Sequence, residues 1–244
     1  MSKICVVLPT YNEAVNLPCL AEKIETVLRG VSFGLIVVDD SSPDDTAGVA
    51  ERLNRVYGNI TVKVRAKKSG LGSALLTGLK VALSDGDVER IVTLDADFSH
   101  DPGEIPRLLC AAEDADLVQG SRYVRDGLVA RWGFKRRLVS YVANLICKLV
   151  VRTSIHDSTG NFRVYSRRCA EVIVGSTRAK GFEWVVEAVA VAKRGGFHVK
   201  EVPITYVNRE GGETKLKGLQ FIGWLAFVVK SLFSQEPLFA GGSV

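Results

Sequence analysis

Apolar runs alternate with amphipathic segments through the first half of the chain. The runs lack polar alternation, which is typical of strands that are buried on both faces of a sheet. We therefore expect strands at residues 4–8, 34–39, 60–65, 90–94 and 116–119, and helices near residues 13–29, 44–56, 71–83 and 103–113. This alternation predicts an α/β fold with a mostly parallel sheet, right-handed crossovers and flanking helices.

The alternation stops after residue 119. We expect a Gly- and Arg-rich loop at 120–134, a helix with a basic start at 135–151, a polar loop at 153–163 that leads into a short strand, a helix at 181–194, a strand at 198–206 and a polar loop at 207–217. The pattern predicts one domain over residues 1–217, with halves 1–119 and 120–217, followed by an apolar segment and tail at 218–244.

Residues 218–233 are apolar around much of a helical circumference, but Lys230 interrupts them. The uncharged run is therefore shorter than the ~20 residues that span a bilayer. An amphipathic helix that lies on a membrane surface, with Trp224 at the interface, fits this pattern. A helix packed against the domain or in a dimer fits it equally well.

Length and composition suit a single large α/β domain. The chain has 244 residues, of which 47% are apolar, and its net charge is +5. Basic residues gather in the second half and acidic ones at the ends of first-half strands, which predicts an anionic partner such as a lipid phosphate, an anionic membrane or a nucleic acid. Nucleic acid is disfavoured because the chain shows no platform of interleaved aromatic and basic residues.

The five cysteines are scattered and form no C-x-x-C pair. This spacing indicates neither a zinc site nor a disulfide framework. The sequence runs directly into an apolar strand, without the pattern of a cleavable signal peptide. We therefore expect a reducing, cytoplasmic setting.

Carboxylates stand at the ends of two predicted strands, at Asp39-Asp40 and at Asp95-Ala96-Asp97. The carboxyl ends of parallel strands form the ligand crevice of an open α/β sheet. Acidic groups gathered there repel one another unless a cation or hydrogen-bond donors lie between them. Oxygen ligands of this kind suit Mg²⁺ or Mn²⁺, and such a metal often bridges carboxylates to substrate phosphates. The plainer interpretation is a polar turn after each strand.

Three further groups are candidates for ligand binding. A carboxylate in the Asp39 segment has the position that contacts a ribose hydroxyl or base edge in nucleotide-binding folds. Residues 67–73 resemble a phosphate-binding loop but match no nucleotide motif, and a tight turn explains their glycines equally well. Arg122, Arg136 and Ser140 are candidates for a second anion site, near the start of the helix at 135–151. A solvated basic face is the alternative.

Several motifs occur together and in a characteristic order: Val6-Val7-Leu8-Pro9-Thr10-Tyr11-Asn12-Glu13, Val38-Asp39-Asp40-Ser41-Ser42-Pro43-Asp44, Ser69-Gly70-Leu71-Gly72, Leu94-Asp95-Ala96-Asp97 and Gln119-Gly120-Ser121-Arg122-Tyr123. The set resembles the inverting family 2 glycosyltransferases, which have a GT-A, Rossmann-like fold. Within that family it is most similar to the dolichol-phosphate or polyprenol-phosphate mannose synthases. The resemblance covers roughly residues 3–215.

The resemblance implies a metal-dependent transfer of mannose from GDP-mannose to dolichyl or other polyprenyl phosphate, with inversion. It places the enzyme on the cytoplasmic face of a membrane: the endoplasmic reticulum in a eukaryote, the cell membrane in a prokaryote. A membrane partner subunit is compatible with it. The acceptor phosphate is already an anionic nucleophile, so positioning and electrostatics suffice for the chemistry.

The resemblance also implies roles for individual residues. Those implied to bind the nucleotide sugar are Pro9, Tyr11, Glu13, Asp39, Gly70, Arg209 and Lys215; the metal is assigned to Asp95 and Asp97, and the acceptor phosphate to Arg122, Arg136 and Ser140. Asp95, Asp97, Arg122 and Lys215 form the implied catalytic set. Relatives often carry Gln where this chain has Ser99, and many have C-terminal transmembrane helices.

Two alternative functions remain open from the sequence. A UDP-glucose-dependent transfer to a polyprenyl phosphate, or another family 2 glycosyltransferase activity, would keep the fold and change the substrates. An inactive nucleotide-sugar-binding scaffold is the non-enzymatic alternative, although the acidic and basic residues of an active site are all present. The choice between Mg²⁺ and Mn²⁺, the acceptor chain length and the oligomeric state do not follow from the sequence.

Overall fold

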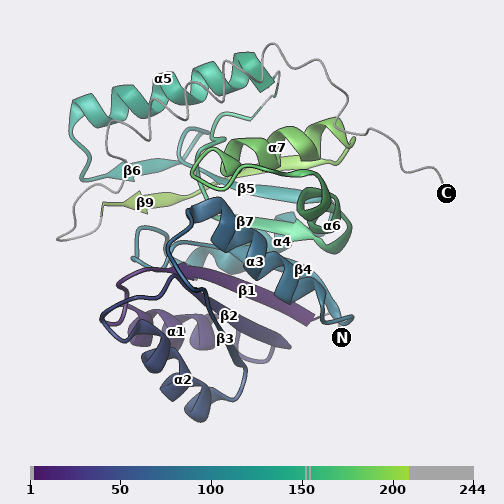
Figure 1. Ribbon diagram of the computed structural model, residues 1–244. Coiled ribbons are helices and arrows are strands. Elements are labelled where there is room, and N and C mark those ends of the chain that lie inside the picture. The colour runs from purple at the N-terminus through teal and green to yellow at the C-terminus, as the bar shows by residue number, and fades with distance from the viewer. Residues whose placement is uncertain (1–2, 152, 154, 209–244) are drawn as a thin grey trace.

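A computed structural model describes residues 3–151, 153 and 155–208 of the chain (Figure 1). The predicted strands and helices of the first half are present: β1 (Lys3–Thr10), α1 (Leu17–Val27), β2 (Phe33–Asp39), α2 (Thr46–Tyr57), β3 (Ile60–Val64), α3 (Leu71–Leu83), β4 (Val88–Thr93), α4 (Ile105–Ala111) and β5 (Leu117–Ser121). A short 3₁₀ turn at Pro102–Glu104 precedes α4, and the side chain of Asp101 accepts a hydrogen bond from its Gly103 N–H.

The second half adds seven elements to the described part of the chain: β6 (Leu128–Ala130), α5 (Phe134–Val151), β7 (Arg163–Ser166), α6 (Arg167–Ser176), α7 (Trp184–Arg194), β8 (Val199–Pro203) and β9 (Thr205–Val207). The last two correspond to one predicted strand that is divided in two. Within the described residues, the main sheet has the order β3-β2-β1-β4-β7-β5-β8. All neighbours are parallel except at β7, which pairs antiparallel with β4 and with β5. The prediction of a mostly parallel sheet is confirmed.

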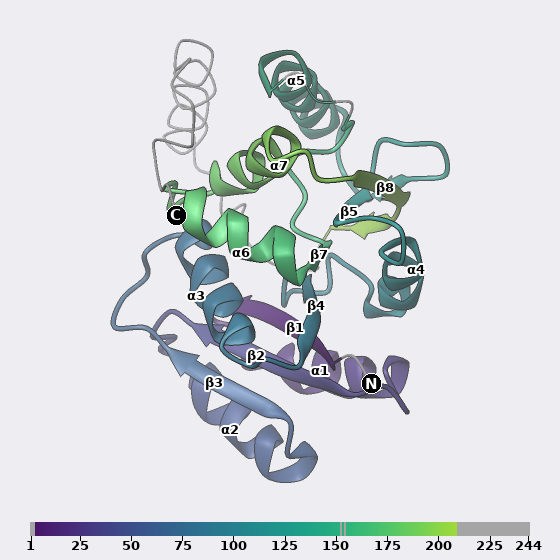
Figure 2. The ribbon, with the colours of Figure 1, turned by 90° about the vertical axis from the view of Figure 1, so that its right-hand side faces the viewer.

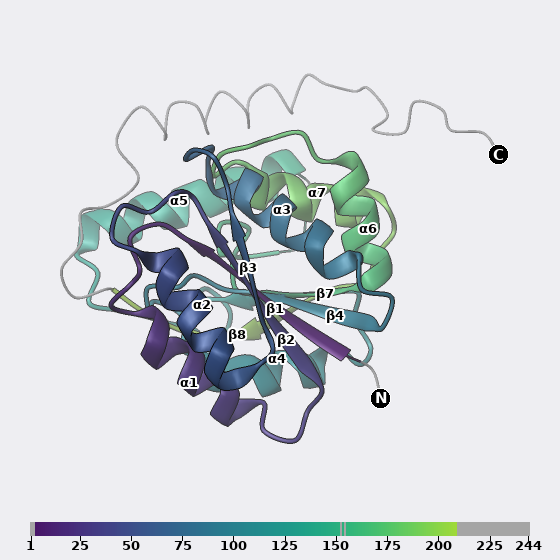
Figure 3. The same ribbon diagram turned by 60° about the horizontal axis from the view of Figure 1, so that its bottom comes forward.

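Helices cover both faces of this sheet (Figure 2). Helices α3, α6 and α7 pack on one face around Leu75, Tyr165 and Trp184, which are fully buried. Helices α1, α2 and α4 cover the other face, around Leu20 and Phe162. Figure 3 shows α1 and α2 on their common side of the sheet. The apolar runs of β1, β2 and β5 are therefore explained by burial on both faces, whereas the edge strand β3 differs from the prediction and leaves Thr61, Lys63 and Val64 exposed.

Three features of the second half differ from the prediction. The loop expected at 120–134 contains β6, and α6 was not expected. The single strand expected at 198–206 is divided at Ile204, where the chain passes from the main sheet to a two-stranded sheet of β6 and β9. Ile204 joins the two sheets through its backbone, because its N–H donates to Ser121 (3.0 Å) and its carbonyl accepts from Leu128 (3.0 Å).

Helix α5 lies outermost on its side of the molecule (Figure 1). Its Ala143 and Cys147 are buried, whereas a stripe of large apolar side chains faces outward. These exposed side chains are Phe134, Leu138, Val139, Tyr141, Val142, Leu145 and Leu149. Within the described residues, no helix is both long and apolar enough to cross a membrane. The apolar segment predicted at 218–233 lies outside the described residues.

Candidate active site

The candidate residues of the described chain gather at one edge of the main sheet. Asp39 ends β2, Asp95 follows β4, and Arg122 follows β5. Strand β1 pairs with β2 on one side and with β4 on the other. Strands β2 and β3 are therefore added on one side of β1 and β4 on the opposite side, so the strand order switches at β1. In open α/β sheets, ligands bind beside the carboxyl ends of strands at such a switch point.

Asp39 is held rigidly at the end of β2. Its side chain is 1% exposed. One carboxylate oxygen accepts hydrogen bonds from the hydroxyls of Thr10 (3.1 Å) and Ser42 (2.5 Å), and the other accepts from the backbone N–H of Ser42 (2.9 Å). A carboxylate can accept about four hydrogen bonds. Asp39 therefore retains capacity for one donor from a ligand, as a ribose hydroxyl would supply.

Asp40, the next residue, has a different role. It pairs with Arg65, whose Nε lies 2.5 Å from a carboxylate oxygen of Asp40. Arg65 also donates to the hydroxyl of Ser73 (2.6 Å) and to the carbonyl of Gly70 (3.4 Å). This arginine thus ties the end of β2 to the start of α3.

The glycine-rich start of α3 contacts another segment of the protein. The N–H groups of Gly72 and Ser73 donate to the carbonyls of Gly181 (3.1 Å) and Lys180 (2.9 Å). Gly70 has φ +95°, and a Cβ there would lie 2.4 Å from the Lys180 carbonyl oxygen. Two of the free N–H groups that open a helix are therefore used internally, which favours the tight-turn interpretation of residues 67–73.

The other candidates from the first motif lie beside Asp39. The backbone N–H of Glu13 donates to the Thr46 hydroxyl (3.0 Å), which joins the loop after β1 to the start of α2. The Glu13 carboxylate is buried and accepts from Asn16 (2.8 Å). The ammonium of Lys68 lies 3.7 Å from the centre of the Tyr11 ring. Pro9, half-buried, precedes them at the end of β1.

Asp95 and Asp97 lie in the loop after β4. Asp97 accepts a hydrogen bond from the Ser99 backbone N–H (3.1 Å), and Asp95 accepts one from the side-chain amide of Asn161 (3.2 Å). In the described part of the chain, no group of three or more His, Cys, Asp or Glu side chains is arranged to bind a metal. A cation held by these two carboxylates would therefore take further oxygen ligands from a bound molecule or water.

His100 is a neutral, structural neighbour of this loop. Its Nδ1 accepts a hydrogen bond from the backbone N–H of Asp95 (3.2 Å), so that nitrogen carries no proton. The ring is 1% exposed, and burial lowers its pKa. It packs against Phe162 and Tyr206 with centroid distances of 5.3 and 5.4 Å. His100 therefore supports the Asp95 loop without an ionic contact.

A cavity of about 400 Å³ joins the acidic and basic candidates. Its lining residues are Leu71, Asp95, His100, Arg122, Trp132, Lys135, Arg136, Val139, Ser140, Ala143, Thr159, Gly160, Asn161, Phe182 and Tyr206. The structure thus brings Asp95 together with Arg122, Arg136 and Ser140. The acidic wall comes from the β4 end, and the basic wall from the β5 end and the first turns of α5.

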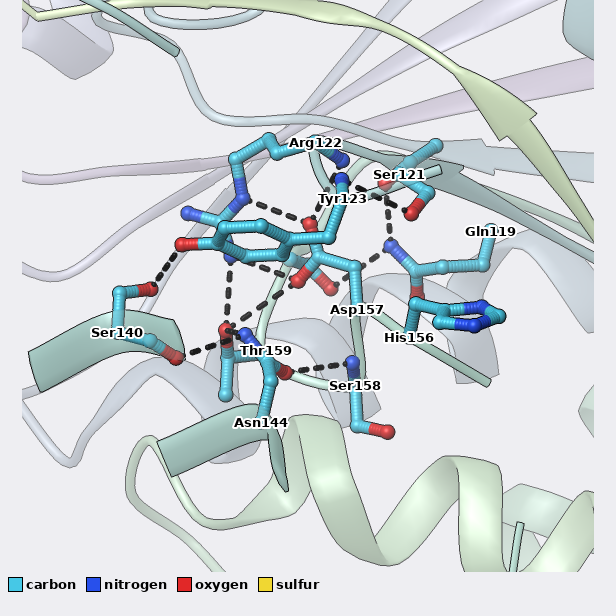
Figure 4. Close-up of polar contacts among 12 residues, drawn as sticks. Gln119, Ser121, Arg122, Tyr123, Ser140, Asn144, His156, Asp157, Ser158 and Thr159 are labelled. Atoms are coloured by element: carbon cyan, nitrogen blue, oxygen red, sulfur yellow. Dashed lines mark hydrogen bonds and ion pairs between the residues drawn. The ribbon is translucent and has the colours of Figure 1, made fainter. Parts of the chain in front are cut away.

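Arg122, which lines this cavity, makes a fork-like ion pair with Asp157 (Figure 4). Its Nε and Nη2 each lie 2.7 Å from a different oxygen of Asp157, and Nη2 also donates to Thr159 (2.8 Å). Both charged side chains are buried. Burial alone would raise the pKa of Asp157, but the charge and hydrogen bonds of Arg122 outweigh it and lower the pKa. The pair stays ionised.

Aromatic rings surround the basic residues. The Arg122 guanidinium lies 5.3 Å from the Tyr206 ring centre and 5.5 Å from that of Trp132, and the Arg136 guanidinium lies 4.2 Å from Trp132. Arg136 also donates to the side-chain oxygen of Asn208 (2.9 Å). Ser140 accepts from the Tyr123 hydroxyl (2.7 Å). These contacts hold the side chains of Arg122, Arg136 and Ser140 in fixed orientations in the cavity.

Sequence reasoning missed several residues of this site. Asp157, Thr159 and Asn161 lie in a segment interpreted only as a polar loop, and no local motif marks them as partners of Arg122 and Asp95. Trp132 and Tyr206 reach the cavity from β6–α5 and β9. Their positions depend on the division of the strand at Ile204. Arg209 and Lys215, predicted to contact the donor, lie outside the described residues.

Residues 5–174 match the Glycosyl transferase family 2 domain, so the chain belongs to this family. It is therefore a glycosyltransferase. Over 220 residues it is 39% identical to the polyprenol monophosphomannose synthase of Mycolicibacterium smegmatis, covering 87% of this chain and 80% of that one. Over 217 residues it is 34% identical to the undecaprenyl-phosphate mannosyltransferase of Micrococcus luteus, with 88% of each chain covered.

Solved structures support the fold. Glucosyl-3-phosphoglycerate synthase from Mycobacterium tuberculosis, in complex with Mn²⁺, UDP-glucose and phosphoglyceric acid, is similar with a TM-score of 0.70. The sequences are 20% identical, and the match covers 96% of this chain and 81% of that one. The same enzyme in complex with Mg²⁺ and UDP gives a TM-score of 0.66, with 96% of this chain and 79% of that one covered at 20% identity. The predicted GT-A-type fold is confirmed.

Proposed function

We propose that the chain transfers mannose from GDP-mannose to a polyprenyl phosphate, with inversion at the anomeric carbon. The observation that carries this proposal is the single cavity that joins Asp95 to Arg122, Arg136 and Ser140. A donor and an anionic acceptor can meet there between an acidic and a basic wall. The names of the two mannosyltransferase relatives support the sugar and the lipid acceptor.

The acidic wall is the proposed donor end. Asp95 and Asp97 would hold Mg²⁺ or Mn²⁺, both of which occur in complexes of the structurally similar synthase. A divalent cation there would stabilise the negative charge of the departing diphosphate. Asp39, with its one open acceptor position, would bind the ribose or base. Pro9, Tyr11, Glu13 and Gly70 would form the surrounding nucleotide pocket.

The basic wall is the proposed acceptor end. Arg136, Lys135 and Ser140 line it, and Arg122 lines the same cavity. An acceptor phosphate is already anionic, so these groups need only bind and orient it toward the sugar. Arg122 contributes mainly through its field, because two of its nitrogens are bound to Asp157. Arg209 and Lys215 are proposed to contact the donor phosphates.

The acceptor's long apolar chain resides in a membrane, so the enzyme has to reach the membrane surface. Helix α5 carries the basic wall and also the outward apolar stripe that includes Phe134, Leu138 and Leu145. A helix of this kind binds the interface between lipid headgroups and acyl chains. We therefore place the enzyme peripherally on the cytoplasmic face of a membrane, with residues 218–233 or a membrane partner subunit as additional anchors.

The test is transfer of radiolabelled mannose from GDP-mannose to a polyprenyl phosphate in detergent, with Mg²⁺, with Mn²⁺ and with a chelator. We expect lipid-extractable label that depends on the metal. Transfer from UDP-glucose alone would overturn the proposed donor and favour a glucosyltransferase. No transfer from any sugar nucleotide would contradict the proposal and favour the scaffold alternative.

A further inference from the structure

Asn161 has one side-chain polar atom without a partner, at the wall of the cavity. The residue is 4% exposed and lies immediately before Phe162, whose ring is fully buried. Its Nδ2 donates to Asp95 (3.2 Å), whereas its Oδ1 is buried and has no hydrogen-bond partner among the described residues. The side chain therefore contacts the acidic wall through one end only.

The orientation of this amide follows from its neighbour. An ionised carboxylate only accepts hydrogen bonds, so the NH₂ group must face Asp95 and the oxygen must face the other way. The backbone is held as well, because the Asn161 carbonyl accepts from the Thr93 hydroxyl (2.7 Å). A buried polar atom without a partner destabilises the empty site, and a ligand group that bonds to it removes that cost.

The chemistry of the cavity defines that ligand group. Asn161 Oδ1 and Asp95 offer hydrogen-bond acceptors, while the cations Arg122, Lys135 and Arg136 line the same cavity and attract anions. Phosphate oxygens are acceptors and suit the cations. The amide oxygen can bind either a hydrogen-bond donor or a cation, and the sugar between the two phosphates carries donors as hydroxyl groups.

We propose that Asn161 binds a hydroxyl group of the transferred sugar through Oδ1 and orients Asp95 through Nδ2. Asn161 is then a determinant of sugar specificity. The inference rests on the proposed function and adds to it the residue that recognises the sugar. A site built to hydrogen-bond a substrate hydroxyl rejects an analogue that lacks it, because the protein group is left buried and unpaired.

The test uses a set of GDP-mannose analogues that each lack one hydroxyl of the sugar. For one of these analogues we expect wild-type kcat/KM to fall roughly 10-fold to 100-fold, as the loss of one buried hydrogen bond predicts. Asn161→Ala should lower kcat/KM for mannose by a similar factor. In this variant, kcat/KM for that analogue should lie within a few-fold of kcat/KM for GDP-mannose, because the oxygen that distinguishes them has been removed.

Asn144→Ala is the matched control. Asn144 is equally buried, but its amide is fully bonded within the protein: it donates to Ser140 (3.1 Å) and Thr159 (3.1 Å) and accepts from Ser158 (2.9 Å). This variant should lower the melting temperature and leave the ratio of mannose to analogue unchanged. Asn161→Ser, which is shorter and cannot reach the same hydroxyl, replaces Asn161→Ala if the alanine variant does not fold.

Three outcomes separate the inference from the proposed function. Unchanged discrimination among the analogues in a folded Asn161 variant would overturn the inference and leave the transferase intact. Retained discrimination with a raised metal requirement would also overturn it, and would make the amide oxygen a metal ligand. No transfer by the wild type from any sugar nucleotide would overturn the proposed function itself.

Discussion

Each half of the described chain holds one arginine–aspartate pair at the carboxyl edge of the sheet, largely shielded from solvent in the first half and buried in the second. In the first half, Arg65 and Asp40 have side chains 11% and 7% exposed, and Arg65 also binds Ser73 and a backbone carbonyl. In the second half, Arg122 and Asp157 are 7% and 0% exposed, and Arg122 lines the cavity. The first pair joins two elements, whereas the second holds a charged residue of the cavity in place.

The same kind of ion pair therefore connects secondary-structure elements in one half and orients a cavity residue in the other. The Asp40–Arg65 pair lies beside Asp39 and holds the start of α3, so it supports the first half of the chain without lining the cavity. The Arg122–Asp157 pair fixes a positive charge where an anion is expected. Its burial makes it costly to disturb, because either charge alone would be left in a poorly solvated environment.

Neutralising the aspartate of each pair should give the largest difference in stability between the two halves. Asp157→Asn should lower the free energy of unfolding by about 3–5 kcal/mol, because Arg122 is left as a buried, uncompensated charge. Asp40→Asn should cost less, about 1–3 kcal/mol, because Arg65 keeps its other partners. Urea denaturation monitored by circular dichroism measures both. A larger loss from Asp40→Asn would show that the first pair carries more of the fold.

The acidic loop should matter for transfer and not for folding. Asp97→Ala is expected to reduce mannose transfer by about 10²–10³-fold, as the loss of one electrostatic contact to a developing charge commonly does. Its melting temperature should stay near that of the wild type. Chelator should produce the same loss in the wild type and little further loss in the variant. Full activity of Asp97→Ala would exclude this carboxylate from the metal site.

Substitution of Gly70 tests the contact between the start of α3 and residues 180–181. A Cβ at this position would lie 2.4 Å from the Lys180 carbonyl oxygen, and the backbone has φ +95°. Gly70→Ala should cost about 1–3 kcal/mol of stability through strain and displacement of that segment. Gly58→Ala is the control, since its φ is +77° but no atom lies within 4 Å of the new Cβ. Equal losses would mean that the backbone angle alone matters.

The apolar stripe of α5 gives the smallest expected effect. Leu145→Asp should weaken cosedimentation with anionic vesicles about 10-fold, because burying one leucine side chain contributes about 1.5–3 kcal/mol. Val56→Asp on α2 is the matched control, since Val56 is also an exposed helical residue. Transfer in detergent should be unchanged in both variants. Equal vesicle binding by both variants would remove α5 as the membrane contact.

The first half could be predicted from sequence because its determinants are local. Strands β1 and β2 each contain an apolar run of four or more residues, β4 ends in three buried residues, and each of these strands is followed by a turn and a helical segment, so the order of elements and the acids at the strand ends follow from short segments. The candidate carboxylates Asp39 and Asp95 therefore lie where the pattern placed them. Asp40 connects the end of β2 to the start of α3 through Arg65. No local sequence pattern indicated that pairing.

The second half depends on contacts between distant segments. Strand β7 is inserted antiparallel between β4 and β5, which brings Asp157 to Arg122 and Asn161 to Asp95 across 35 and 66 residues. A pattern of apolar and polar positions contains no information on such pairing. Arg136 and Ser140 were predicted because they lie near the start of a basic helix, a local feature of the sequence, whereas Asn161 lies at the cavity only through the pairing of distant strands.

The most direct test of the two-walled cavity is to measure donor and acceptor kinetics separately in Asp95→Asn and Arg136→Ala. Asp95→Asn should impair kcat and the KM for GDP-mannose while leaving the KM for polyprenyl phosphate nearly unchanged. Arg136→Ala should raise the KM for polyprenyl phosphate roughly 10-fold or more, as loss of a charge-assisted hydrogen bond predicts, with little change for the donor. Equal effects of both variants on both substrates would contradict the division of the cavity into a donor wall and an acceptor wall.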